Sequence, residues 1–134
     1  MSIASETTPK IEFVTPLMGL SEHTRFEIEP LDDDGMFFTL RSTDDPDLRL
    51  VLADPMPFYP DYDAVIDGET AKSLQIENEG EGAILAVVNM SQGIEKATMN
   101  LFAPIVVNPS AHRAAQALLY GEDHPFDAPL TPQS

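Results

Sequence analysis

Turn-forming residues interrupt this sequence roughly every ten residues, so any helix or strand in it must be short. Clear turn signals are Asp-Asp-Asp-Gly at 32–35 and Asp-Asp-Pro-Asp at 44–47. Between the turns, several segments alternate apolar and polar residues, which is typical of strands with one buried face. The pattern predicts strands at residues 10–15, 25–29, 36–41, 48–54, 61–66, 83–90 and 95–100, and a short helix at residues 68–74.

Short strands at this spacing favour a small antiparallel barrel or a curled sheet. The 134 residues suit one domain with one core, and no internal repeat or linker divides them. We therefore expect a mainly β, single-domain, antiparallel β-barrel-like fold with one or two short helices. The apolar segment 83–90 is expected to be buried on both faces, and residues 114–120 are ambiguous because their alanines favour a helix by propensity.

The two ends of the chain are predicted to lie outside the packed fold. Residues 1–9 are expected to form a mobile arm, and residues 121–134, which carry three prolines and few apolar residues, a loose tail. No apolar stretch typical of a signal peptide is visible near the N-terminus. The longest apolar runs are far shorter than the roughly 18 residues of a membrane helix. A soluble cytoplasmic protein without membrane contact is the expectation.

Residues 100–108 form an apolar run, Asn-Leu-Phe-Ala-Pro-Ile-Val-Val-Asn, bracketed by two asparagines. Pro104 cannot donate a hydrogen bond to a neighbouring strand, so a regular central strand is not expected there. A bulge, an edge or a kink between two short strands fits the run better. Asn100 and Asn108 can hydrogen-bond to the backbone at either end of this irregularity.

The formal charge of −16 comes from 23 acidic and 7 basic residues and is unevenly distributed. Residues 27–81 hold sixteen acidic and three basic residues, a net charge of −13. This charge argues against direct binding to nucleic acid, because phosphates would be repelled. A basic protein partner would be attracted and its association steered. The alternative is that the acidity only keeps the protein soluble.

The sequence contains no pattern that indicates catalysis, a metal or a cofactor. Neither acidic cluster, at 32–34 or at 61–67, has the spacing of a calcium-binding loop of the EF-hand type. None of the three histidines stands in a pattern typical of a catalytic triad or zinc site, and the absence of cysteine excludes disulfides and thiolates. An acidic calcium- or ligand-binding β-barrel remains the alternative to a protein-binding role. A hydrolase with an acidic site is a third possibility, for which no nucleophile can be named.

A proline-stiffened loop carries the most promising candidate binding residues. Rigid aromatic side chains ringed by charge are typical of protein-binding hot spots. For Phe58 the sequence favours a structural role, in which the ring folds back and plugs the barrel end. For Tyr59 and Tyr62 it favours an interface. The residues of this candidate site are Phe58, Tyr59 and Tyr62, flanked by Asp54, Asp61 and Asp63.

The 100–108 segment resembles the NL-x-AP-x-x-x-N signature of the FliW-type flagellar assembly factors. The likeness extends from about residue 13 to about residue 120 and includes further matching segments. The matching segments are Leu-Met-Gly-Leu at 17–20, Phe-Thr-Leu-Arg-Ser at 38–42, Asp54-Pro55, Pro-Asp-Tyr at 60–62, and Gln116. Two positions depart from the family pattern: Ser21-Glu22 replaces the usual Gly-Phe pair, and residues 112–115 lack a glycine that relatives often carry.

The resemblance implies a fold and a function. It implies that residues 114–120 form a closing strand, and that the protein acts by binding rather than as an enzyme. FliW-type proteins bind CsrA, a basic RNA-binding regulator, and relieve its repression of flagellin translation. They also bind flagellin itself, which frees CsrA to repress again. The chain is then expected to be a monomer when free of partners, with no cofactor.

Both partner surfaces can be given candidate residues from the sequence. We expect CsrA on the acidic middle of the chain, because charge steers it there. We expect flagellin near the apolar 100–108 edge, because an apolar helix face can dock in an apolar groove. The candidate partner-binding residues are Asp45, Tyr59, Asp61, Tyr62 and Asp63 for the first surface, and Asn100, Pro104 and Asn108 for the second.

Overall fold

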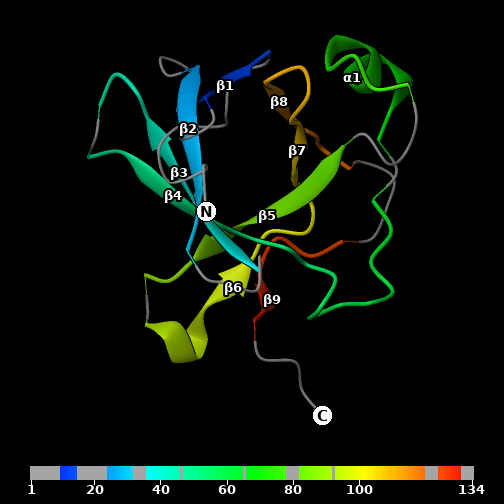
Figure 1. Cartoon of the computed structure of the whole chain (residues 1–134). Coiled ribbons are helices and arrows are strands. Elements are labelled where there is room, and N and C mark those ends of the chain that lie inside the picture. The colour runs from blue at the N-terminus through cyan, green and yellow to red at the C-terminus, as the bar shows by residue number, and fades with distance from the viewer. Residues whose placement is uncertain are drawn as a thin grey trace, which may run out of the picture.

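The computed structural model describes residues 10–14, 24–31, 36–45, 47–64, 66–77, 82–91, 93–119 and 124–130. The described part is mainly β with one short α-helix, as the sequence predicts (Figure 1). The strand predicted at 95–100 is wrong at its start, because residues 94–96 form a turn of 3-10 helix and the strand comprises only Thr98–Met99. The strands are β1 (Lys10–Phe13), β2 (Arg25–Pro30), β3 (Phe37–Ser42), β4 (Arg49–Ala53), β5 (Ala83–Asn89), β6 (Thr98–Met99), β7 (Ile105–Asn108), β8 (Arg113–Gln116) and β9 (Ala128–Pro129). The helices are α1 (Gly68–Ser73) and η3 (Ile94–Lys96).

Seven strands close into a barrel. Their order is β4-β3-β2-β1-β8-β7-β5, and pairing of β4 with β5 closes the ring. Strand β6 pairs with β5, and β9 pairs with β6, so these two short strands extend the sheet away from the ring. Strands β1 and β8 pair in parallel, whereas every other pairing between described strands is antiparallel. The predicted antiparallel barrel is therefore confirmed, with this one parallel pair as an exception.

Alternating apolar residues fill the barrel. On β1, Ile11 and Phe13 are buried while Lys10 and Glu12 are exposed, as expected for a strand with one face in the core. The rings of Phe13 and Phe26 meet edge to face at 5.3 Å between centroids. The barrel core consists of Ile11, Phe13, Phe26, Leu40, Leu52, Leu85, Ile105, Val107 and Ala114.

Two further clusters cover parts of the outer surface of the barrel. Val106 and Ala115 face outward from β7 and β8, and Leu74, which follows α1, packs on them. Asp67 caps the N-terminus of helix α1, and its side chain accepts a hydrogen bond from the Thr70 amide at 3.1 Å. The third cluster covers β4, β5 and β6 and contains Ala53, Ala86, Val88, Ala97, Met99, Leu101, Ala128 and Leu130.

The 100–108 segment contains the predicted kink. Strand β6 ends at Met99 and β7 begins at Ile105, with Pro104 directly before β7. The Asn100 side-chain oxygen accepts hydrogen bonds from the Phe102 and Ala103 amides, both at 3.0 Å. These bonds hold the irregular backbone between the two strands, as expected of an asparagine at a turn.

Two expectations about the middle of the chain are corrected. The predicted strand at 61–66 is wrong, because the Tyr62 amide donates to the Tyr59 carbonyl oxygen in a turn and no described residue of this segment pairs in a sheet. Its alternating residues Tyr62, Ala64 and Ile66 instead pack on the outside of the barrel. Strand β5 is not buried on both faces throughout, since Ala83 and Asn89 at its ends are exposed.

The C-terminal part of the chain is more ordered than its composition predicts. Residues 114–120 were ambiguous, and β8 shows that they begin in a closing strand, which agrees with the resemblance. The loose tail predicted at 121–134 is wrong for residues 128–130. Ala128 and Leu130 are buried, and the Leu130 amide donates to the Ala97 carbonyl oxygen at 3.0 Å. The predicted arm at 1–9 lies outside the described residues.

Candidate protein-binding site

The chain turns sharply after β4 and forms a proline-rich loop. The buried Pro55 accepts hydrogen bonds at its carbonyl oxygen from the Phe58 amide at 3.0 Å and the Tyr59 amide at 2.8 Å. The Asp54 side chain accepts a further bond from the Met56 amide at 3.0 Å. Prolines cannot continue a strand ladder, so the loop folds as a turn that places three aromatic rings against the barrel.

Phe58 packs against the barrel, as the sequence favours, but on its outer surface and not at its end. Its ring meets that of Phe37 at 6.0 Å in an edge-to-face contact. Phe37 and Phe58 both pack against the cluster outside β4, β5 and β6 rather than against the barrel core. Phe58 therefore covers the outer surface of the barrel, and the prediction that it plugs the barrel end is wrong.

Both tyrosines are half-buried and held by their hydroxyl groups. The Tyr59 hydroxyl donates to the Pro129 carbonyl oxygen, and the Tyr62 hydroxyl donates to the Leu101 carbonyl oxygen at 2.7 Å. The Tyr62 ring also meets the His124 ring at 4.9 Å between centroids. Burial raises the pKa of Tyr59 above its ordinary value. Because these bonds fix the rings, a partner would meet them already oriented.

These rings form a hollow of about 460 Å³, which we call the aromatic hollow. Its lining combines apolar surface with an exposed carboxylate at Asp61, and Asp63 and Asp127 are exposed close by in the sequence. Two large apolar side chains of the same segments are also exposed: Met56 is 46% exposed and Phe126 is 71% exposed. The lining residues are Phe58, Tyr59, Pro60, Asp61, Tyr62, Leu101 and Pro129.

The structure brings some of the predicted site residues together and separates others. Tyr59, Asp61 and Tyr62 line the aromatic hollow, and Asp63 follows directly. Asp45 lies in the turn between β3 and β4, where its side chain accepts a hydrogen bond from the Asp47 amide at 3.1 Å. Because that turn precedes β4 and the aromatic loop follows it, Asp45 and Tyr59 lie at opposite ends of this strand.

The 100–108 segment does not offer the apolar edge that the sequence predicts. Pro104 and Asn108 are buried, and so are Ala103 and the apolar residues of β7. Their side chains therefore leave almost no surface for a partner, and the assignment of Pro104 and Asn108 as partner-binding residues stays a prediction. Asn100 is half-buried beside Leu101, at the border of the aromatic hollow.

Sequence reasoning missed the residues that complete the aromatic hollow. Leu101 and Pro129 come from segments far from the 58–62 loop in sequence, and neither carries a local binding signal. The alternating Ala128 and Leu130 are the signal that could have indicated a packed segment near Pro129.

Nothing in the described part of the chain suggests a metal centre or a membrane span. Within the described ranges, no group of three or more His, Asp or Glu side chains could hold a metal ion. The acidic turn at 32–34 lies outside them. Among the described helices, none is long and apolar enough to cross a membrane.

These features define a class: a small closed β-barrel whose candidate site is a preformed aromatic hollow bordered by carboxylates. Comparison with known proteins gives the family. The model of the FliW protein family matches residues 1–130, and the chain therefore belongs to the FliW family.

Individual relatives support the same assignment. The chain is 36% identical over 118 residues to flagellar assembly factor FliW 2 of Desulfotalea psychrophila, covering 88% of this chain and 78% of that protein. It is 31% identical over 124 residues to flagellar assembly factor FliW of Bacillus subtilis, covering 92% and 87%. A crystal structure of the flagellar assembly factor FliW superposes with a TM-score of 0.86 at 26% identity, covering all of this chain and 92% of that one.

Proposed function

We propose that this protein is a flagellar assembly factor that binds a CsrA-type regulator and flagellin, and thereby couples flagellin level to flagellin translation. Membership of the FliW family supports the role in flagellar assembly. The two partners are what the family resemblance implies. The role is one of binding, without catalysis.

The aromatic hollow is the observation that carries the proposal for CsrA. An apolar side chain of the regulator enters between Tyr59 and Tyr62, while its Lys and Arg side chains face Asp61 and Asp63. The acidic residues speed association, because a basic partner is drawn toward a negative surface. Charge alone does not distinguish one basic protein from another, so specificity comes from the contacts inside the hollow.

The first experiment measures the rate of CsrA association at increasing salt. We expect the rate to fall when the salt concentration rises from about 0.05 to about 0.5 M, because screening shortens the range of steering. A rate that stays constant over this range would remove the acidic surface from the mechanism.

A second experiment locates the contact with two charge reversals. Asp61→Lys changes the border of the aromatic hollow, and Asp44→Lys makes the same change of net charge in the turn at the other end of β4. We expect Asp61→Lys to accelerate CsrA dissociation and Asp44→Lys to affect mainly association. Equal dissociation rates for the two variants would place the contact elsewhere.

The feedback itself is tested by partner exchange. Coupling of flagellin level to translation requires that flagellin and CsrA weaken each other's binding, through shared surfaces or coupled sites. Flagellin added to a preformed complex of this protein with CsrA should release CsrA. A stable ternary complex with unchanged affinities would contradict the feedback.

A further inference from the structure

The outer surface of β1, β2, β3, β4 and β8 carries a concentration of basic residues that the overall composition hides. We call these residues the basic strip: Lys10, Arg25, Arg41, Arg49 and Arg113. They are five of the chain's seven basic residues. Among the described residues of these strands, three are acidic, Glu12, Glu27 and Glu29, so the eight charged side chains sum to +2, whereas the whole sequence carries −16.

Strand register aligns four charged residues in one row across the barrel. Lys10 on β1 faces Glu27 on β2, Glu27 faces Arg41 on β3, and Arg41 faces Arg49 on β4. Neighbouring strands lie about 4.8 Å apart, so Lys10 and Arg49 are separated by about 14 Å at their backbones.

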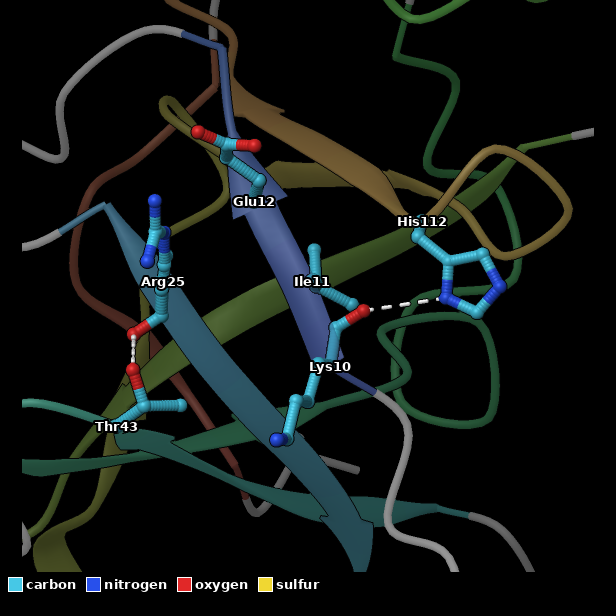
Figure 2. Close-up of a pocket in the computed structure, with 6 residues that line it drawn as sticks. All are labelled: Lys10, Ile11, Glu12, Arg25, Thr43 and His112. Carbon is cyan, nitrogen blue, oxygen red and sulfur yellow. Dashed lines mark hydrogen bonds between the residues drawn. The ribbon is translucent and has the colours of Figure 1, made fainter.

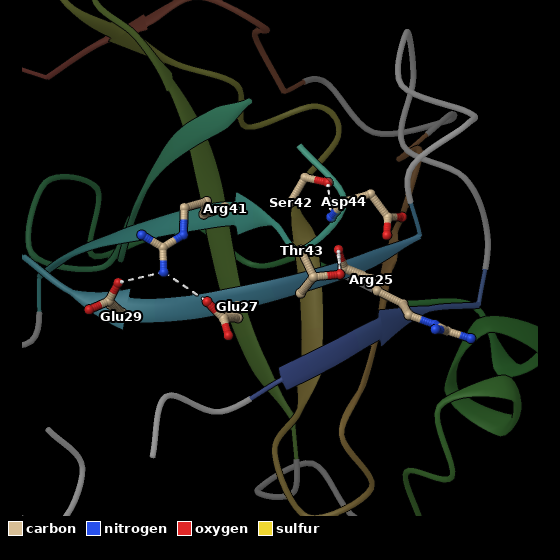
Figure 3. A network of polar contacts seen from close by, with 7 residues as sticks. All are labelled: Arg25, Glu27, Glu29, Arg41, Ser42, Thr43 and Asp44. Atoms are coloured by element: carbon tan, nitrogen blue, oxygen red, sulfur yellow. Dashed lines mark hydrogen bonds and ion pairs between the residues drawn. The ribbon is translucent and has the colours of Figure 1, made fainter. Parts of the chain in front are cut away.

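Arg41 already engages two acidic residues of β2, Glu27 in this row and Glu29 beyond it. Arg41 forms an ion pair with Glu27 at 2.8 Å and lies 3.8 Å from Glu29, and Figure 3 shows its guanidinium between the two carboxylates. The Glu27 carboxylate also raises the pKa of Arg41. Glu27 therefore does not neutralise Lys10, although the two residues face each other in register.

Three cations of the strip form no ion pair in the described part of the chain, although Glu12 faces Arg25 in register. Within the described residues, no ion pair involves Lys10, Arg25 or Arg49, and all three side chains are exposed. Arg49 faces Arg41, an arrangement of like charges that costs stability in a sheet. Arg113 is turned to the Ser73 carbonyl oxygen at 3.3 Å, near the end of α1.

A hollow lies at one end of the row. It measures about 330 Å³ and is lined by Lys10, Ile11, Glu12, Arg25, Thr43 and His112. Figure 2 shows Lys10 and Arg25 on neighbouring strands, with His112 on the other side of β1, where its Nδ1 lies 3.2 Å from the Lys10 carbonyl oxygen. Two cations and an imidazole thus border a space that contains one carboxylate.

We propose that the basic strip docks a short acidic peptide segment of a partner protein, which lies in extended form across the strands. One carboxylate of the segment enters the hollow beside Lys10 and Arg25, and another reaches Arg49. In an extended peptide, side chains four residues apart are separated by about 13 Å and point to the same side. That separation matches the distance from Lys10 to Arg49.

The charges around the strip determine how the peptide lies on the strands and which kind of molecule can bind there. Asp44, Asp45 and Asp47 are exposed where β3 turns into β4, so a peptide that lay along the strands would meet carboxylates. A nucleic acid would extend beyond the strip over a chain of net charge −16, and its phosphates would be repelled. A segment of about five residues stays close to the cations of the strip, and screening limits the effect of more distant acidic residues to roughly 8–10 Å.

The strip shares no residue with the lining of the aromatic hollow, so this surface is separate from the one proposed for the basic regulator.

The test is a titration of the ¹⁵N-labelled full chain with the peptide acetyl-Gly-Glu-Ser-Glu-Ser-Glu-Gly-amide at low salt. We expect amide shifts confined to β1–β4 and the 110–113 turn, and none with the matched peptide that carries Gln in place of Glu. The double variant Lys10→Gln/Arg49→Gln should bind the Glu peptide about fivefold more weakly. The double variant Lys72→Gln/Lys96→Gln removes the chain's two other basic residues, which are exposed on α1 and η3, and should bind as the wild type does.

Several outcomes would overturn the proposal. Equal weakening in the two double variants would mean that only net charge matters, and equal binding of the Gln peptide would remove the carboxylates from the interaction. Tighter binding of a ten-residue oligouridylate at the same amides would identify the strip as a nucleic-acid surface. Concentration-dependent shifts of the same amides without peptide would identify it as a contact between copies of this chain. Unchanged melting temperatures of both variants would confirm that any lost binding is not lost folding.

Discussion

The Asn108 side-chain amide donates to the Leu74 carbonyl oxygen at 2.7 Å and so joins the end of β7 to the residue that ends α1. The same amide lies 3.3 Å from the Gln75 carbonyl oxygen, and the Asn108 side-chain oxygen accepts from the Ser110 amide at 3.2 Å. Asn108 is only 3% exposed, and these bonds satisfy its polar atoms inside the fold. Gln75 adopts a φ of 61° directly after the helix, so the joint also holds a backbone conformation that few non-glycine residues adopt.

Replacement of Asn108 by Ala should lower the free energy of unfolding by roughly 1–3 kcal/mol, because the Leu74 carbonyl oxygen loses a buried donor. Urea denaturation measures this loss. The control is Asn89→Ala, since Asn89 is exposed and its side chain accepts one bond, from the Ser91 amide. Equal losses in the two variants would show that the buried joint contributes no more than an exposed turn.

Asn100 should act through its side-chain oxygen alone. That oxygen accepts from both the Phe102 and Ala103 amides, which hold the kink before Pro104. Asn100→Ala should therefore lower the free energy of unfolding by roughly 1–3 kcal/mol. Asn100→Asp keeps an acceptor oxygen at the same place and should lose less. If Asn100→Ala instead melts like the wild type and loses CsrA, Asn100 belongs to the interface.

The local elements of this fold follow from local sequence patterns. The alternation around Ile11, Phe26 and Leu40 predicts β1, β2 and β3, because each strand shows one face to the barrel core. The sequence also predicts a short helix at residues 68–74, and α1 lies there at Gly68–Ser73. Pro104 predicts the kink for a simple reason, the missing backbone donor.

What connects these elements could not be read from single segments. The parallel pairing of β1 with β8 and the closure of β4 onto β5 join residues far apart in sequence. The segment with Tyr62 and Ile66 has the alternating pattern of a strand. Its apolar side chains pack on the outside of the barrel, but its described residues pair with no neighbouring strand. The aromatic hollow combines three separate segments, so only part of it could be predicted. The basic strip could not be predicted from the net charge, because the net charge does not show that strand pairing brings Lys10, Arg41 and Arg49 onto one surface.

Tyr62 allows its hydroxyl and its ring to be tested separately. Tyr62→Phe removes the hydrogen bond to the Leu101 carbonyl oxygen, which should lower the free energy of unfolding by roughly 0.5–1.5 kcal/mol. The ring, and its contact with His124, remain. If the ring is the partner contact, Tyr62→Phe should retain most of the CsrA affinity and Tyr62→Ala should lose it. Equal affinity of all three proteins, measured by calorimetry, would contradict a contact at Tyr62.

Asp67 should make the stability of α1 depend on pH. Its carboxylate accepts hydrogen bonds from the Thr70 hydroxyl at 2.6 Å and the Thr70 amide at 3.1 Å, and these bonds lower the pKa of Asp67 below its ordinary value of 3.8. The folded protein thus binds the Asp67 proton less readily than the unfolded chain does. The stabilisation is therefore fully present above about pH 4 and is lost as the pH falls through the lowered pKa.

Two variants separate the charge of Asp67 from its role as a helix cap. Asp67→Ala should cost about 1 kcal/mol at pH 7, because the first turn of α1 loses its side-chain acceptor. Asp67→Asn keeps an acceptor oxygen and cannot titrate, so its stability relative to the wild type should rise as the pH is lowered from 5 toward 3. Denaturant unfolding at several pH values measures both effects. A constant difference between Asp67→Asn and the wild type over this range would show that the Asp67 carboxylate is not preferentially charged in the folded state.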